Sequence, residues 1–364
     1  MKKIFLTLAL TFSFALAAEA PQGWELGFFE RFDTANPILY PNPESHFYCP
    51  VQKKEVPWEG EHTFNPGAVV RHGTVYLFYR AEDNFSQGIG QHTSRLGLAE
   101  SFDGFHFKQK TLPIFFPDED SQTAHEWPGG CEDPRLVETE DGMYVMTYTQ
   151  WNRKVAVLGV ATSTDLMHWT KHGYVFDHAH EGKFGRQWSK SGSIVCRLEG
   201  DRLIATQIQG KYWMFWGEGT VHLATSDDLI SWQPLVDHSG KPLVILAPRP
   251  GKFDSALVES GPPALLTQKG IVLIYNGKNA AENGDPTIGP GAYSAGQVLF
   301  EAHDPTQILT RTEECFFRPE RPYETRGQYV DGTVFVQGLV HHQGRWLLYY
   351  GAADSVAGVA YSNK

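Results

Sequence analysis

The chain has 364 residues and a formal net charge of −11, and 13% of its residues are aromatic. An acidic chain of this kind repels polyanions, so nucleic acid and an anionic membrane are not expected partners. Its four cysteines lack C-x-x-C spacing, so zinc is not signalled. No cofactor and no metal site are predicted.

The first residues have the pattern of an export signal. Lys2 and Lys3 precede an uncharged apolar run over residues 4–18, with small residues at Ala15 and Ala17. A membrane span needs about 20 apolar residues, which is longer than this run. We therefore predict a signal peptide at residues 1–17, export to the periplasm or beyond, and no membrane insertion after cleavage. In an exported chain some of the cysteines can pair, or they can remain free and buried.

A pair of short apolar runs separated by a polar turn recurs five times in the remaining chain. Each copy has small residues before the first run and aromatic residues in most of the second runs, which is typical of a β-hairpin. The copies lie at residues 66–70 with 75–79, 133–137 with 143–148, 191–195 with 203–206, 261–266 with 271–275, and 337–340 with 346–350.

Further apolar runs at residues 95–104, 160–166 and 223–229 follow the first three pairs and end in or near Asp103, Asp165 and Asp228. Because the same Asp recurs where only the geometry repeats, these carboxylates are interpreted as turn caps. Two hairpins per unit make a four-stranded blade, so residues 18–364 are predicted to form one all-β domain, a five-bladed β-propeller with its active site at the central channel. A two-sheet sandwich is the alternative fold. Residues 27–32 are expected to supply the strand that the short fifth unit lacks.

Polar side chains cluster at the starts of the repeated pairs, where a propeller would gather them around its axis. They are Asn65, Arg80, Glu132, Asp133, Arg135, Lys190, Asp254, Glu259 and Asp354, with Glu218 after residues 212–215. Tyr212, Trp213 and Trp216 lead into Glu218 and are candidates for a sugar-stacking platform.

These residues resemble glycoside hydrolase family 130. The resemblance covers residues 65–360 and rests on several motifs taken together: Asn65-Pro66, Tyr79-Arg80-Ala81-Glu82, Ser94-Arg95-Leu96-Gly97-Leu98-Ala99, Glu132-Asp133-Pro134-Arg135, Lys190-Ser191-Gly192 and Tyr350-Gly351-Ala352-Ala353-Asp354. It implies a five-bladed propeller that acts on β-mannosides with inversion. It also implies that Asp133 is the catalytic acid and that the mannosyl unit is held by Asn65, Arg80, Arg95, Lys190, Tyr212 and Asp354. We add Asp254 as a further substrate-binding candidate.

The family contains both phosphorolysis and hydrolysis, and the sequence favours hydrolysis. Phosphate needs cations beside the attacking group, whereas Glu218 and Glu259 would repel it and would suit a general base that activates water. Their sequence context resembles that of the family's exported β-1,2-mannosidases, and manno-oligosaccharides are therefore the expected substrate. A β-mannoside phosphorylase and a non-catalytic sugar-binding propeller are the alternatives; the oligomeric state is not predicted.

Overall fold

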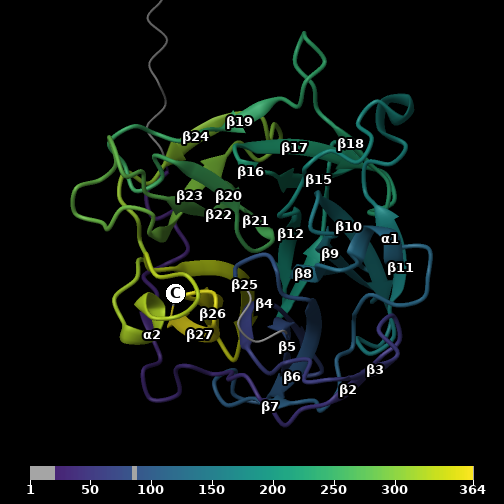
Figure 1. Cartoon of the computed structure of the whole chain (residues 1–364). Helices are drawn as coiled ribbons and strands as arrows, with labels where there is room; N and C mark the ends of the chain where they lie inside the picture. The colour runs from purple at the N-terminus through teal and green to yellow at the C-terminus, as the bar shows by residue number, and fades with distance from the viewer. Residues whose placement is uncertain (1–20, 84–87, 364) are drawn as a thin grey trace, which may run out of the picture.

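The computed structural model describes residues 21–83 and 88–363 and is built almost entirely from β-strands (Figure 1). Helices within the described residues are single turns: α1 (Thr123–Glu126), α2 (Pro322–Thr325) and the 3-10 turn η1 (Ala179–Gly182). None of them has the length or apolar character needed to cross a bilayer. The predicted all-β class is confirmed. The predicted signal peptide lies outside the described residues.

The first two sheets each contain four strands paired antiparallel in chain order. The first two hairpins predicted from the sequence, now β4–β5 and β8–β9, are confirmed. The bounds are β4 (His62–Arg71), β5 (Thr74–Glu82), β6 (Ser94–Ser101), β7 (Lys108–Gln109), β8 (Gly130–Glu138), β9 (Tyr144–Trp151), β10 (Ala156–Ser163) and β11 (Thr170–Tyr174).

The middle of the chain forms two less regular sheets. Strand β12 pairs antiparallel with both β13 and β15, and β22 pairs with β20, β21 and β23. The predicted third and fourth hairpins are therefore confirmed as β12–β13 and β21–β22. The bounds are β12 (Ser193–Glu199), β13 (Arg202–Ala205), β14 (Gln207–Ile208), β15 (Lys211–Trp216), β16 (Glu218–Gly219), β17 (Val221–Ser226), β18 (Trp232–Pro234), β19 (Val244–Leu246), β20 (Leu257–Ser260), β21 (Ala264–Thr267), β22 (Gly270–Lys278), β23 (Tyr293–Phe300) and β24 (Ile308–Arg311).

The last sheet joins the two ends of the described chain. Strands β25 (Val334–His342), β26 (Arg345–Ala352) and β27 (Val356–Ser362) pair in order, and β1 (Glu30–Arg31) pairs antiparallel with β27. The predicted fifth hairpin and the predicted N-terminal strand are thus both confirmed. Strands β2 (Phe47–Cys49) and β3 (Lys54–Val56) form a separate hairpin.

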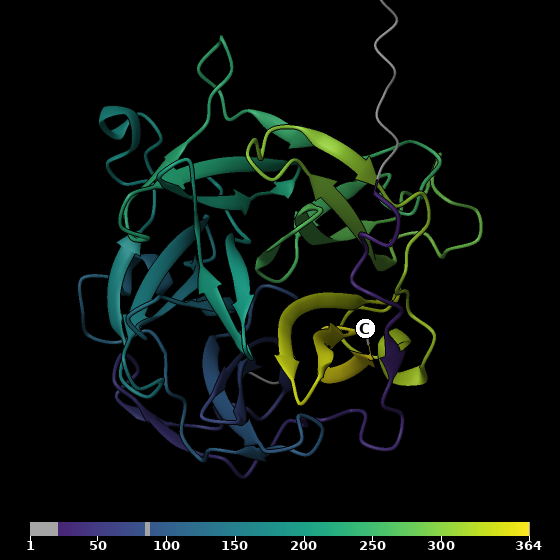
Figure 2. The same ribbon diagram turned by 180° about the vertical axis from the view of Figure 1, so that it is seen from behind.

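The sheets follow one another around a common centre, and the purple N-terminal segment lies beside the yellow C-terminal sheet (Figures 1 and 2). Near the centre, β12 pairs parallel with β21, and β13 meets β8. Arg135 Nε donates to the Gly261 carbonyl at 2.7 Å, and Gln337 Nε2 donates to the Pro134 carbonyl at 2.9 Å. These bonds fix the inner strands relative to one another, so polar side chains at their ends hold defined positions.

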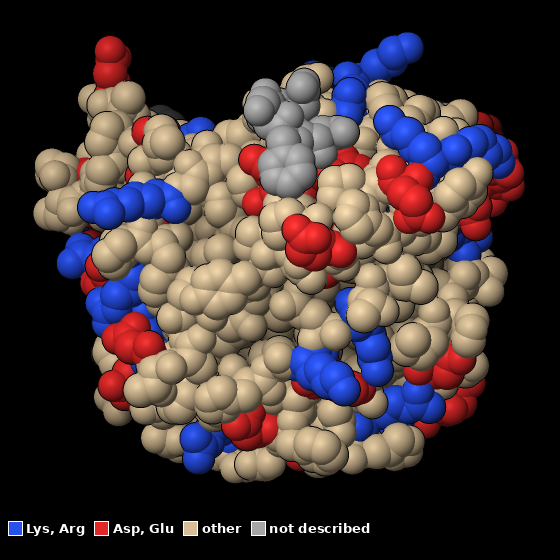
Figure 3. All heavy atoms as spheres, turned by 60° about the horizontal axis from the view of Figure 1, so that its bottom comes forward, with Lys and Arg blue, Asp and Glu red and all other residues tan. Residues whose placement is uncertain are grey.

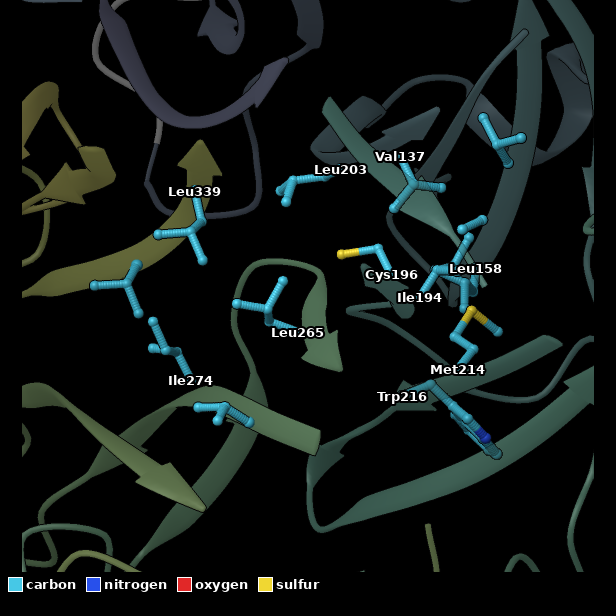
Figure 4. Packing of buried hydrophobic residues seen from close by; sticks show 14 of the residues in the cluster. Val137, Leu158, Ile194, Cys196, Leu203, Met214, Trp216, Leu265, Ile274 and Leu339 are labelled. Atoms are coloured by element: carbon cyan, nitrogen blue, oxygen red, sulfur yellow. The ribbon is translucent and has the colours of Figure 1, made fainter. Parts of the chain in front are cut away.

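The largest apolar cluster lies between sheets rather than within one. Figure 4 shows Val137 of β8, Ile194 of β12, Leu265 of β21 and Leu339 of β25 turned toward one another, and each is at least 96% buried. Burial of apolar surface from sheets far apart in the sequence stabilises their arrangement around the centre.

The recurring Asp residues cap turns, as predicted. In each case Oδ1 accepts backbone N–H groups two and three residues further on: Asp103 from residues 105 and 106, Asp165 from 167 and 168, and Asp228 from 230 and 231. A Ser two residues before each Asp bonds to the same carboxylate. The turns therefore bind their own backbone and are not ligand sites.

The four cysteines, all within the described residues, are unpaired, and three of them are buried. On the face shown in Figure 3, Lys and Arg side chains alternate with Asp and Glu, and the described residues of that face form no continuous surface of one sign.

Candidate active site

A pocket of about 270 Å³ lies at the ends of the central strands, and charged groups and aromatic rings line it. Eight residues singled out in the sequence meet there: Asn65, Arg80, Glu132, Asp133, Lys190, Glu218, Glu259 and Asp354. The other lining residues are Ile89, Gly90, Trp151, Ala156, Trp188, Tyr293, Tyr329, Thr333 and Phe335.

Backbone irregularities aim the polar side chains into the pocket. Asn65, Asp133 and Asp354 have φ values of 45°, 51° and 50°. The first two lie at register shifts in β4 and β8, and each precedes a proline. A residue before proline normally adopts an extended conformation, so the left-handed conformation here is strained. Asn and Asp tolerate it better than most residues, which explains the residue type at these positions.

Arg80, near the end of β5, is surrounded by carboxylates. Its guanidinium lies 2.5 Å from Glu82, 2.9 Å from Glu132 and 3.5 Å from Asp133. Asn65 Nδ2 also donates to Asp133 Oδ1, at 2.9 Å. Asp133 is therefore oriented from two sides by groups on the neighbouring sheet.

Lys190 has the same role on the other side of the pocket. Its Nζ lies 3.9 Å from Asp133, 3.8 Å from Glu218 and 4.0 Å from Glu259. One ammonium thus holds the predicted acid and both candidate bases around one point, and opposing charges raise the pKa of Lys190 despite its burial.

The two glutamates are cross-strand partners in the pairing of β16 with β20. Trp188 Nε1 donates to Glu218 Oε2 at 2.7 Å, and the Ser191 hydroxyl donates to Glu259. Glu259 is buried and Glu218 is partly exposed, so their carboxylates meet different amounts of water.

Burial raises the pKa of Glu132, Glu259 and Asp354 to about 7. At Asp133 burial acts in the same direction, but the charges of Arg80 and Lys190 outweigh it and hold the pKa below its ordinary value. Glu132 and Asp133 are adjacent and share Arg80, so they titrate as a pair, and this pair retains one proton up to about pH 7.

Three predicted substrate contacts do not reach the pocket. Arg95 follows Ser94, whose hydroxyl contacts Glu132, and successive residues of a strand point to opposite faces. Arg95 is therefore buried on the other face, where it pairs with Asp83 at 2.6 Å.

Tyr212 and Asp254 miss the pocket for different reasons. Tyr212 is the second residue of β15, whose far end leads toward Glu218, and it does not line the pocket. Asp254 is buried between Arg249 at 2.9 Å and Arg311 at 2.5 Å, and it accepts a hydrogen bond from Tyr275.

The aromatic residues predicted to stack on the sugar are not the ones that line the pocket. Trp216 is buried in the apolar core and neither Trp213 nor Tyr212 lines the pocket, whereas Trp151 and Trp188 do, with ring centroids 5.9 Å apart. Tyr293 and Tyr329 are further lining residues not singled out in the sequence, whereas Glu132 was singled out there but given no role in the site. For Trp188 the available signal was its place two residues before Lys190.

A pocket with five carboxyl groups, two cations and a rim of aromatic rings defines a class of protein that processes carbohydrates, because sugars pack on rings while their hydroxyls bind charged groups. The chain belongs to glycoside hydrolase family 130: residues 29–364 match the family model described as beta-1,4-mannooligosaccharide phosphorylase.

Characterised relatives and solved structures agree with this family. The chain is 33% identical over 315 residues to a 1,2-beta-oligomannan phosphorylase of Thermoanaerobacter sp. (strain X514), covering 85% of this chain and 93% of the relative. It is 51% identical, with a TM-score of 0.93, to a putative glycosidase from Bacteroides thetaiotaomicron VPI-5482, covering 95% and 99% of the two chains. It is 50% identical, with a TM-score of 0.93 and coverage of 95% and 96%, to a structure described with family-130 glycoside hydrolases that target beta-1,2 mannosidic linkages in Candida mannan.

Proposed function

We propose that the protein hydrolyses β-mannosides, with β-1,2-linked manno-oligosaccharides as its substrates, and inverts the anomeric configuration. Membership of family 130 supports a mannoside as the substrate. The β-1,2 linkage is supported by the phosphorylase relative and by the hydrolase structure, both of which carry that linkage in their descriptions.

The charge balance of the pocket is the observation that favours hydrolysis over phosphorolysis. Arg80 and Lys190 are the cationic side chains among the described lining residues, and each already contacts three carboxylates. Phosphorolysis needs cations free to bind an inorganic phosphate. Beside Glu218 and Glu259, phosphate would be repelled, whereas a water molecule would be activated.

The proposed mechanism uses the Glu132–Asp133 pair as the acid and Glu218 or Glu259 as the base. Asp133, Glu218 and Glu259 all lie within 4.0 Å of Lys190 Nζ, so their nearest oxygens are at most about 8 Å apart. Inverting glycosidases hold acid and base about 6.5–9.5 Å apart, which leaves room for water. The proton that this pair retains up to about pH 7 is the one given to the leaving oxygen.

Incubation of the purified protein with β-1,2-mannobiose, with and without phosphate, tests this proposal. Hydrolysis releases mannose at the same rate in both, whereas a phosphorylase makes mannose 1-phosphate and only with phosphate present. A non-catalytic sugar-binding protein makes neither product. Proton NMR during turnover follows the anomer, and α-mannose as the first product is expected for inversion.

Asp133→Asn is expected to lower kcat/KM by about 10²–10⁴-fold, because the acid is lost while the side-chain shape is kept. Asp201→Asn is the matched control, since Asp201 lies at the surface beside His341. Full activity of a folded Asp133→Asn protein would refute the assignment of the acid.

We also propose that the five successive sheets are the blades of a propeller closed by β1, and that the protein is exported. The pairing of β1 with β27 and the arrangement around one centre support the first proposal. The Lys-initiated apolar run supports the second. N-terminal sequencing of the protein recovered from cell fractions tests export: an exported product begins near residue 18, and an uncleaved cytoplasmic product would overturn it.

A further inference from the structure

A second cluster of chemically active side chains lies beside the pocket, between β4 and β6. His62 begins β4, and its cross-strand partner Glu82 ends β5. His92 lies just before β6, and one ligand-type atom from each of the three residues falls within 4.8 Å of the others.

His92 is prepared to act as a ligand. Its Nδ1 lies 2.8 Å from the Asp83 carbonyl, which can only accept a hydrogen bond, so the proton is on Nδ1 and the lone pair is on Nε2. This Nε2 is buried, has no hydrogen-bond partner among the described residues, and lies 3.9 Å from Glu82 Oε2. A backbone carbonyl that fixes the tautomer of a histidine is the usual support for a metal-binding imidazole.

The surroundings suit a cation. Glu82 is buried and contacts Arg80 and Ser94 through Oε1 and Gln328 through Oε2, which leaves Oε2 a lone pair. Arg80 is positively charged, but Glu82, Glu132 and Asp133 around it outnumber it. The side chain of His62 is 13% exposed, so the cluster meets solvent at this residue.

We propose that His62, Glu82 and His92 bind one divalent transition-metal ion of the zinc type. Two imidazoles, a carboxylate and an open fourth position form a common zinc ligand set. Ligand atoms around tetrahedral zinc are about 3.4 Å apart, so side-chain movements of about 1 Å complete the site.

The metal would fix the segment that carries His92. Ile89 and Gly90 of this segment line the sugar pocket, and Trp151 Nε1 bonds to the Gly90 carbonyl at 3.1 Å. The ion is thus a structural support for one wall of the pocket and has no part in the chemistry proposed for Asp133, Glu218 and Glu259.

Zinc binding to the untagged, metal-free full-length protein tests the site. In competition with a chromogenic chelator, the wild type is expected to bind one equivalent of Zn²⁺ with a Kd in the micromolar range or below. His62→Ala and His92→Ala are each expected to weaken binding by at least about 100-fold. Zn²⁺ is expected to raise the Tm of the wild type and leave that of both variants unchanged.

His168→Ala is the matched control, because the exposed His168 lies 2.7 Å from a carboxylate, that of Asp165. It should retain full binding. Circular dichroism without metal establishes that the variants are folded, and His92→Gln, which keeps the side chain's bulk, replaces His92→Ala if that variant does not fold. No binding to the wild type, or equal binding to wild type and folded variants, would overturn the site.

Discussion

The surroundings of each carboxyl group in this pocket determine its pKa. Glu259 and the Glu132–Asp133 pair both titrate near neutral pH, yet with Glu259 as the base the reaction needs Glu259 without its proton and the pair with one. Burial keeps protons on these groups to higher pH than in water, while Arg80 and Lys190 limit the effect. The same two cations therefore hold the carboxylates of the pocket in place and limit how far the pKa values of these carboxylates rise.

With Glu259 as the base, these pKa values predict a bell-shaped dependence of kcat/KM on pH with a maximum near 7. Below about pH 7 Glu259 gains a proton and is lost as a base; above about pH 7 the Glu132–Asp133 pair loses the proton it must donate. If Glu259 is the base, Glu259→Gln should remove most activity and the acidic limb of what remains.

Glu218→Gln is the comparison for that experiment, because Glu218 lies opposite Glu259 in the strand pairing. A Glu259→Gln protein that keeps both activity and its acidic limb would assign the base to Glu218. A profile that is flat between pH 5 and 9 would contradict the involvement of either titrating group.

At the scale of strands and turns, the Ser-x-Asp turns that connect strands are local stabilising elements. Asp228→Ala is expected to lower the free energy of unfolding by about 1–2 kcal/mol, because the variant loses an acceptor for two backbone N–H groups. Chemical denaturation measures the change.

The adjacent Asp227 provides the control. It forms an exposed ion pair with Lys211, and such pairs contribute about 0–1 kcal/mol. Asp227→Ala should therefore change stability much less than Asp228→Ala. Equal losses in the two variants would show that the turn hydrogen bonds do not account for the effect.

Strand-level patterns predicted the hairpins well, because alternating apolar residues and polar turns are local signals. They also predicted that Asn65, Asp133 and Lys190 meet, since each begins a repeated unit. The family resemblance failed for Arg95, because a motif does not say which face of a strand a residue occupies. The strand-level patterns missed Trp188, whose place depends on an irregular segment between β11 and β12.

At the scale of the whole molecule, an ion pair holds the N-terminal strand to the last sheet. Arg31 of β1 lies 2.6 Å from Glu324 of α2, and both side chains are at least 93% buried. Tyr350 of β26 also donates to this carboxylate, at 2.9 Å. The strand is thus held by side chains as well as by backbone pairing.

Arg31→Met is expected to cost about 3–5 kcal/mol of stability, because it leaves the Glu324 carboxylate buried without its cation. Arg321→Met is the control, since its pair with Asp33 is exposed and should contribute about 1 kcal/mol or less. Thermal and denaturant unfolding compare the two, and similar small losses would show that the Arg31 pair does not hold the strand.

The pairing of Glu30 with Tyr361 spans nearly the whole described chain. A ribosome synthesises residue 361 long after residue 30, so β1 must wait for β27 before it gains its backbone partner. Until then the growing polypeptide has an open edge, and truncation at either end should leave that edge available to other molecules.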